Sequence, residues 1–250
     1  MPVLNIADEA YTVRVTAGEN NTGIQAIIDT SLGHTVIETT ACTNCASGAV
    51  DTSGAGLTAS ADVASGTYMS PSSTYEGVEG TATLCIYEEG IYSTTPDNSN
   101  VGSMPCIQSF PVHFAETVAT PNENANVHLG AALGLGADKD GATPDATDNF
   151  MTEFVSAGKL SSGTTMFALA LTADDGNGSD ASLTTSFMDL GSVTTSATDS
   201  DVTKATIQFD DNEFYWKTDI NGIGFGPYTQ SENYGLTSSK ITVETASQCL

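Results

Sequence analysis

The 250-residue sequence is short of positive charge. It has six lysine and arginine residues against 31 aspartates and glutamates, a formal net charge of −25. DNA, RNA and anionic membranes bind proteins through basic patches, so this shortage argues against all three as partners. Only 15% of the residues are charged, so the acidity reflects scarce bases rather than long acidic tails. We expect neutral or cationic partners, or further copies of the chain.

Long apolar runs are also missing. None approaches the length of about 18 residues that predicts a membrane-spanning helix, so no membrane span is expected. The first residues, Met1-Pro2-Val3-Leu4, lack the basic and apolar regions of a secretory signal. If the protein is exported, we expect that its signal has already been removed.

Cysteine is infrequent but informative. Five cysteines in a chain rich in glycine, serine and threonine favour an oxidising compartment, with two disulfides and one remaining thiol as the simplest count. Asn20-Asn21-Thr22 and Asn177-Gly178-Ser179 match the acceptor pattern for N-glycosylation at Asn20 and Asn177. We therefore predict a secreted or extracellular protein, or one in an acidic lumenal compartment.

Short β-rich stretches recur between clusters of turn residues, and they predict an all-β fold with little helix. No repeat of roughly 20 to 50 residues is found, so a solenoid or propeller is not expected. The expected strands are Tyr11–Val15, Ile24–Asp29, Thr35–Ile37, Thr81–Tyr87, Met166–Leu171, Phe187–Leu190, Ala205–Phe209 and Glu213–Ile220.

One segment has the pattern of a helix. In Asp148–Gly158, Asp148 can cap the start, Phe150 and Phe154 share an apolar face, and Gly158 can end the helix. The oxygen-rich segment Asp174–Asp180 lacks the spacing and closing glutamate of an EF-hand loop, so it is interpreted as a solvated turn rather than a calcium site.

Several motifs follow one another along the chain. An apolar strand leads into Asp29-Thr30-Ser31, and Cys42-Thr43-Asn44-Cys45 comes next, followed by Tyr75–Gly80 and by the apolar-glycine segment Ala132–Gly136. Their order resembles that of the pepsin-like aspartic peptidase family, in which an Asp-Thr-Gly triplet, a small cysteine loop, a flap hairpin and a buried apolar-glycine signature occur in turn. Later segments that match the family in order are Phe150–Leu160, Met166–Leu171, Asp189–Gly191 and Phe214–Ile223.

The resemblance implies a complete first lobe over residues 1–165, then an interlobe strand and a partial second lobe over 166–250. It implies catalytic roles for Asp29, Thr30 and Ser31, with Tyr75 on the flap. Family catalysis needs two aspartates that share a proton and activate a water, and no cofactor. The sequence ends where the second triplet would begin, so the second aspartate is expected to be absent from this chain.

The resemblance and the cysteine pattern together give the disulfides. Cys42 and Cys45 correspond to the family's small disulfide loop, and their spacing also suits zinc, but no second such pair follows and the histidines lack ligand spacing. Cys85 and Cys106 flank a hairpin-like excursion and form the natural second pair. Cys249 would then be unpaired, or bonded beyond the chain. No metal and no cofactor are predicted.

The departures from the family bear on function. Ser31 replaces glycine, Leu32 stands where a hydroxyl usually bonds the catalytic carboxylate, and Val36 replaces an aromatic residue. Asp29 also fits a strand-end aspartate that accepts backbone hydrogen bonds, and Tyr75 fits a plain strand tyrosine. These points favour a non-catalytic protein with a structural, binding or self-assembly role, since a partial lobe exposes sheet edges.

Two peptidase alternatives remain open. One is an aspartic endopeptidase with a peptide substrate, whose chain continues beyond Leu250 into a second Asp-Thr/Ser-Gly triplet. The other is a homodimer in which two copies of Asp29 meet.

Overall fold

A computed structural model gives the fold. It describes residues 3–6, 10–19, 22–45, 50–67, 74–86, 105–119, 130–136, 149–160, 167–171, 187–191, 208–210, 213–225 and 232–243. Most of these residues lie in strands and one short stretch is helical, so the expected all-β class with minor helix is confirmed. The predicted glycosylation sites Asn20 and Asn177, the turn predicted at Asp174–Asp180, and Cys249 lie outside the described residues.

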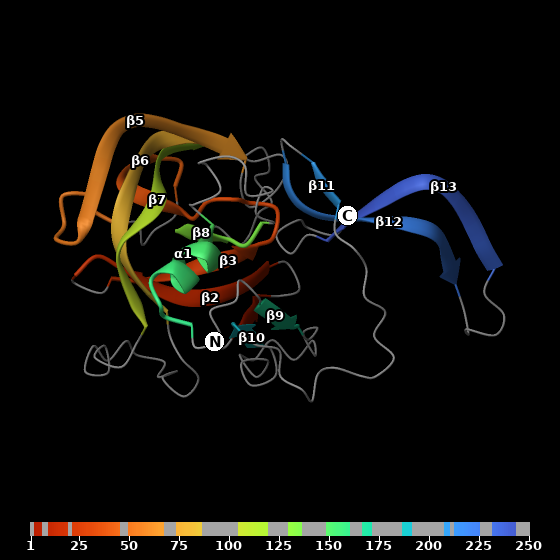
Figure 1. Cartoon of the computed structure of the whole chain (residues 1–250). Coiled ribbons are helices and arrows are strands. Elements are labelled where there is room, and N and C mark those ends of the chain that lie inside the picture. Colours follow the sequence, from red (N-terminus) through yellow and green to blue (C-terminus); the bar gives the residue numbers. More distant parts are fainter. Residues whose placement is uncertain are drawn as a thin grey trace.

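A barrel-like sheet forms the main body of the molecule (Figure 1). Its strands are hydrogen-bonded in the order β1-β2-β3-β8-β4-β7-β6-β5, and a further pairing of β2 with β6 closes β2, β3, β8, β4, β7 and β6 into a ring. The strands are β1 (Leu4–Ile6), β2 (Ala10–Ala17), β3 (Thr22–Asp29), β4 (Val36–Thr43), β5 (Leu57–Thr67), β6 (Thr74–Ile86), β7 (Cys106–Ala119) and β8 (Ala131–Gly134).

Strand β8 lies between β3 and β4, although these two are consecutive in sequence. It pairs in parallel with β3, where Asp29 is opposite Gly134, and antiparallel with β4, where Val36 is opposite Ala132. All four residues of β8 are buried. A strand that is covered on both faces reads as a continuous apolar run, which explains why this segment has the composition Ala-Ala-Leu-Gly.

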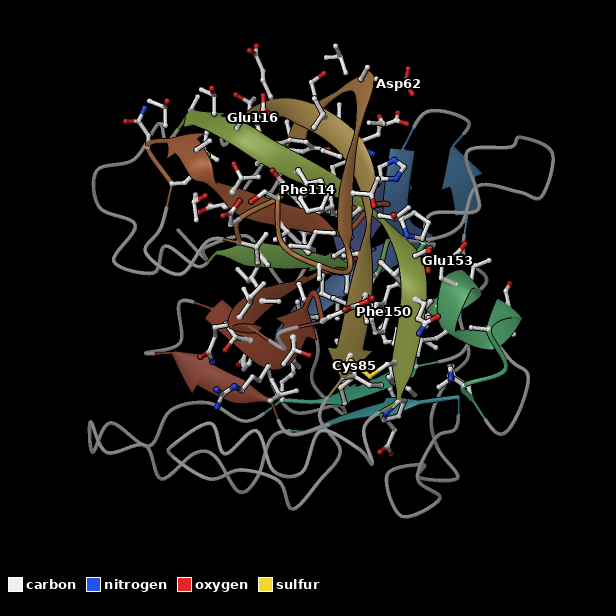
Figure 2. The ribbon with its side chains drawn as sticks, turned by 90° about the vertical axis from the view of Figure 1, so that its left-hand side faces the viewer. Asp62, Cys85, Phe114, Glu116, Phe150 and Glu153 are labelled. Atoms are coloured by element: carbon white, nitrogen blue, oxygen red, sulfur yellow. A yellow bond between two sulfur atoms is a disulfide. The ribbon has the colours of Figure 1, made fainter. Side chains whose placement is uncertain are left out.

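The barrel core is filled by branched and aromatic side chains from alternating strand positions. Ile28, Leu84, Phe110 and Phe114 are among its fully buried members, and Figure 2 shows Phe114 and Phe150 within the body of the molecule. One core cluster includes residues from β2, β3, β4, β6, β7, β8 and the helix, so these elements fold around a common interior.

The helix α1 (Phe150–Ser156) covers part of this core. Phe150, Met151 and Phe154 are buried, and the Phe110 ring lies 5.9 Å from that of Phe150. The cap is Asn149, one residue later than predicted: its Oδ1 accepts from the Met151 N–H at 2.9 Å, and its amide donates to the Gly136 carbonyl at 2.5 Å. The second bond ties the helix to the end of β8, a link that a cap at Asp148 would not provide.

The helix end was predicted correctly. Gly158 has φ of +65° and its N–H donates to the Val155 carbonyl, while the next N–H, from Lys159, donates to Phe154. Only glycine adopts this left-handed conformation without strain, so it suits a helix terminus.

Both predicted disulfides are present. Cys85 and Cys106 are register partners on β6 and β7, with Cα atoms 4.1 Å apart. Cys42 and Cys45 close a small loop at the end of β4, with Cα atoms 5.5 Å apart and Asn44 at a positive φ of 63°. Among the described helices, none is long and apolar enough to cross a membrane.

The C-terminal elements form two further sheets. The hairpin β9 (Phe167–Ala170) and β10 (Phe187–Leu190) lies next to the barrel, because Met188 is buried in the barrel core and Phe167 and Leu169 pack against it. The strands β11 (Gln208–Asp210), β12 (Glu213–Phe225) and β13 (Glu232–Val243) form an antiparallel sheet. Figure 1 shows the β12–β13 ribbon extending away from the barrel.

Candidate functional site

Asp29 is the last residue of β3, where the chain turns through residues 30–35 into β4. Its side chain is 1% exposed and Thr30 is also buried. The backbone N–H of Ser31 donates to Asp29 Oδ1 at 2.8 Å, and the Ser31 hydroxyl donates to the same oxygen at 2.6 Å. The triplet therefore forms a tight turn in which two donors of one serine bind one carboxylate oxygen.

The end of strand β8 and the two residues after it hold this turn in place. The Leu135 N–H donates to the Asp29 carbonyl and the Gly136 N–H donates to the Leu32 carbonyl, both at 2.8 Å. A Cβ at Gly134 would collide with the carbonyl group of His34, so glycine is required for this close approach. The Asp29 turn and the Ala132–Gly136 segment, which carry two parts of the family resemblance, are therefore hydrogen-bonded neighbours.

A second copy of the same triplet provides an internal comparison. Asp51-Thr52-Ser53 has the same three residues and the same two bonds: the Ser53 N–H and hydroxyl donate to Asp51 Oδ1 at 2.9 and 2.7 Å. Asp51 and Ser53 are exposed, whereas Asp29 is buried. The hydrogen-bond pattern is therefore a local property of an Asp-Thr-Ser turn, and burial is what distinguishes Asp29.

The exposed turn gives a test of these bonds. The Ser53 hydroxyl, with a smaller contribution from the Ser53 N–H, holds the pKa of Asp51 below its ordinary value. Because the pKa of Asp51 is lower in the folded state than in the unfolded state, its ionised carboxylate stabilises the folded protein at pH values above the unfolded-state pKa. This stabilisation is lost as the pH falls through the folded-state pKa. Ser53→Ala should raise the pKa of Asp51 toward its ordinary value in a carboxyl NMR titration. An unchanged pKa would show that the hydroxyl bond is not formed.

The hydroxyl donor of the site is Ser31. Leu32 was expected to be unable to donate the hydroxyl bond that the family makes from its position, and the neighbouring Ser31 hydroxyl donates to Asp29 Oδ1. Leu32 belongs instead to a second apolar cluster, here called the outer cluster. The outer cluster consists of Ile27, Leu32, Val36, Ala64, Tyr75, Ala115, Val118 and Ala132, with Cys42 and Cys45 packed against it.

Tyr75 was predicted on a flap hairpin over residues 75–80, and the structure shows this segment as one strand of the antiparallel pair β5–β6, with Tyr75 opposite Gly66. The whole segment lies inside β6, which runs without interruption from Thr74 to Ile86 and pairs with β5 and β7 on either side. Tyr75 is 2% exposed, and its hydroxyl is 2.5 Å from Nδ1 of His113. The alternative interpretation, a plain strand tyrosine, fits these observations.

The surroundings of Tyr75 keep it neutral. Burial raises the pKa of its phenol, and the negative charge of Glu79 raises it further. Tyr75→Phe removes the hydroxyl and leaves His113 without this buried bond, so we expect a loss of about 1.5 kcal/mol in the free energy of unfolding. Denaturant unfolding monitored by circular dichroism measures it. A variant as stable as the parent would show that the bond adds nothing to stability.

Two histidines form a feature that the sequence analysis missed. The rings of His34 and His113 stack with centroids 4.4 Å apart and an interplanar angle of 23°. They line a recess of about 120 Å³ together with Glu79, Gly80, Pro111 and Val112. The sequence signal was weak, because His34 lies in the Asp29 turn and His113 in β7, far apart in the chain.

The described residues contain no group of three or more His, Cys, Asp or Glu side chains arranged to hold a metal ion. Cys42 and Cys45, whose spacing left zinc open, are joined in a disulfide.

No model of a known protein family and no curated protein matches the sequence.

Proposed function

We propose that the protein is a secreted, non-catalytic relative of the pepsin-like aspartic peptidases, in which Asp29-Thr30-Ser31 is a structural turn. The observation that carries the proposal is the second turn at Asp51-Thr52-Ser53. It makes the same two hydrogen bonds on the exposed surface, so this arrangement needs no catalytic purpose. At Asp29 the turn follows the end of β3 and is hydrogen-bonded to the two residues that follow β8.

Two further observations support this proposal. The Asp29 turn and the β8 segment, which the resemblance matches separately, contact each other through backbone hydrogen bonds. Tyr75, which a working flap would direct toward a substrate, is buried in the β5–β6 hairpin and bonded to His113. Its side chain is therefore engaged inside the protein in this structure.

The role proposed for the scaffold is assembly through the sheet β11–β13. Within the described residues, β11 and β13 are each paired with β12 alone, so each has an outer edge. Unpaired edges form hydrogen bonds readily with strands of another chain. The partner would be a second copy of the protein or the remainder of a second lobe, and Cys249 could add a covalent link.

Sedimentation velocity tests assembly directly. Because the chain carries a net charge of −25, copies repel one another at low ionic strength, and salt screens this repulsion. We expect larger species to increase between about 10 mM and about 0.5 M salt, with Cys249→Ser separating covalent from non-covalent association. A single monomeric species at every salt and protein concentration would contradict assembly.

One observation favours a second function, that of an aspartic endopeptidase. The Ser31 hydroxyl supplies Asp29 with the hydrogen bond that Leu32 cannot donate, so this carboxylate has the hydroxyl donor that one half of a catalytic pair needs. This function needs a second carboxylate that shares a proton with Asp29. It predicts cleavage of peptides at acid pH that depends on Asp29.

A further inference from the structure

The outer edge of β5 is an exposed strand edge of the barrel. Among the described strands β5 is hydrogen-bonded to β6 alone, and most of its residues are exposed. Val63 is 80% exposed and is the one large hydrophobic residue exposed in the part of the chain that the structure describes. Figure 1 shows β5 along the outside of the barrel, at the end opposite β9 and β10.

The strand is interrupted at one point. Its register with β6 shifts between Ala59 and Val63, where the Asp62 N–H donates to the Ser60 hydroxyl at 3.0 Å. Such irregularities limit pairing at an edge. From Val63 to Thr67 the register with β6 is regular, and small side chains such as Ser65 and Gly66 leave room for a neighbouring backbone.

The charge around this edge has one sign. Asp62 lies beside Val63, Glu76 is the register partner of Ser65 on β6, and Glu79 follows on the same strand; all three are exposed. The sequence has no lysine or arginine between Arg14 and Lys139, so from β3 to β8 the basic side chains are histidines, of which His34 and His113 line a recess with Glu79. Figure 2 shows Asp62 at the outer margin of the molecule.

We propose that the β5 edge from Val63 to Thr67 binds an extended basic peptide, which adds to the sheet as a further strand. Main-chain hydrogen bonds would supply affinity, Val63 an apolar contact, and Asp62, Glu76 and Glu79 selection for lysine or arginine side chains. The site is separate from the sheet β11–β13, so this inference does not depend on assembly there.

Charge also argues against a second copy of the chain as the occupant. Pairing of two β5 edges would bring two sets of the same carboxylates together, and neither β5 nor β6 carries a lysine or arginine. Like charges across a strand pair are destabilising, whereas a lysine-bearing strand turns the same groups into attractive contacts.

The test uses the whole protein and a labelled peptide of alternating lysine and valine, with fluorescence anisotropy as the readout. Two control peptides keep the length: one has glutamate in place of lysine, and one has proline at alternate positions to prevent strand pairing. We expect the lysine peptide to bind, more weakly as salt rises, and to protect the amides of Val63–Thr67 from hydrogen exchange. Neither control should bind.

Two variants locate the site. Val63→Lys should weaken binding of the lysine peptide about tenfold. The new positive charge repels the peptide's lysines, and the apolar contact made by Val63 is lost. Asp62→Asn should weaken binding roughly two- to fivefold, and Glu153→Gln on α1, which removes one charge elsewhere, should not. Failure of the lysine peptide to bind, equal binding of the proline control, or protection of β5 by self-association without peptide would each overturn the proposal.

Discussion

Gly134→Ala is expected to lower the free energy of unfolding by about 3 kcal/mol. The added Cβ would meet the carbonyl group of His34 and lie 2.8 Å from the Leu32 carbonyl oxygen. Both are backbone atoms in the turn that follows Asp29, so neither can move aside by a change of side-chain rotamer. Either β8 or the turn must shift, and the bonds from Leu135 and Gly136 to this turn would be distorted.

Gly23→Ala is the matched control, because the new Cβ would meet only the flexible side chain of Arg14. We expect its unfolding free energy to stay close to that of the parent. Urea unfolding of both variants makes the comparison. Equal stability of Gly134→Ala and the parent would show that β8 does not pack closely beneath the Asp29 turn.

Asp29→Ala is expected to destabilise the protein by about 3 kcal/mol, because the N–H and hydroxyl of the half-buried Ser31 lose the buried carboxylate that accepts both bonds. Asp51→Ala removes the same bonds from an exposed turn. Water can replace the acceptor there, so little loss of stability is expected. The two variants share one local sequence and differ mainly in burial.

The conservative variant Asp29→Asn sharpens this comparison. Its amide oxygen can still accept both bonds from Ser31, so we expect it to recover most of the stability that Asp29→Ala loses. Thermal and urea unfolding of the three variants give the measurement. Equal losses for Asp29→Ala and Asp51→Ala would argue against a structural role for the buried turn.

Local patterns in the sequence predicted much of the barrel. The apolar run before Asp29 is β3, and the helix ends at Gly158 as expected, because backbone preferences there depend on near neighbours. The Cys85–Cys106 pair was also predicted, since both residues border one excursion of the chain. In each case the signal lies within a short stretch of sequence.

Other features depend on contacts between distant segments and could not be predicted in this way. β5 was missed because its exposed, small residues lack the alternation of a half-buried strand. Tyr75–Gly80 looks like a turn because of its two glycines, but Gly77 is required by the close approach of the Phe114 backbone on β7, and Gly80 by that of the Thr58 carbonyl on β5 and the Phe114 ring. The stacking of His34 on His113 likewise depends on the pairing of β4 with β7.

The most direct test of the central claim is peptide cleavage by the whole protein at about pH 4, where two-aspartate peptidases act. A mixed peptide library would be incubated with the parent, Asp29→Asn and Asp51→Asn, and new termini would be identified by mass spectrometry. A structural role for Asp29 predicts that the three proteins give the same termini as buffer alone. Cleavage by the parent and by Asp51→Asn, but not by Asp29→Asn, would contradict the account and identify Asp29 as a catalytic residue.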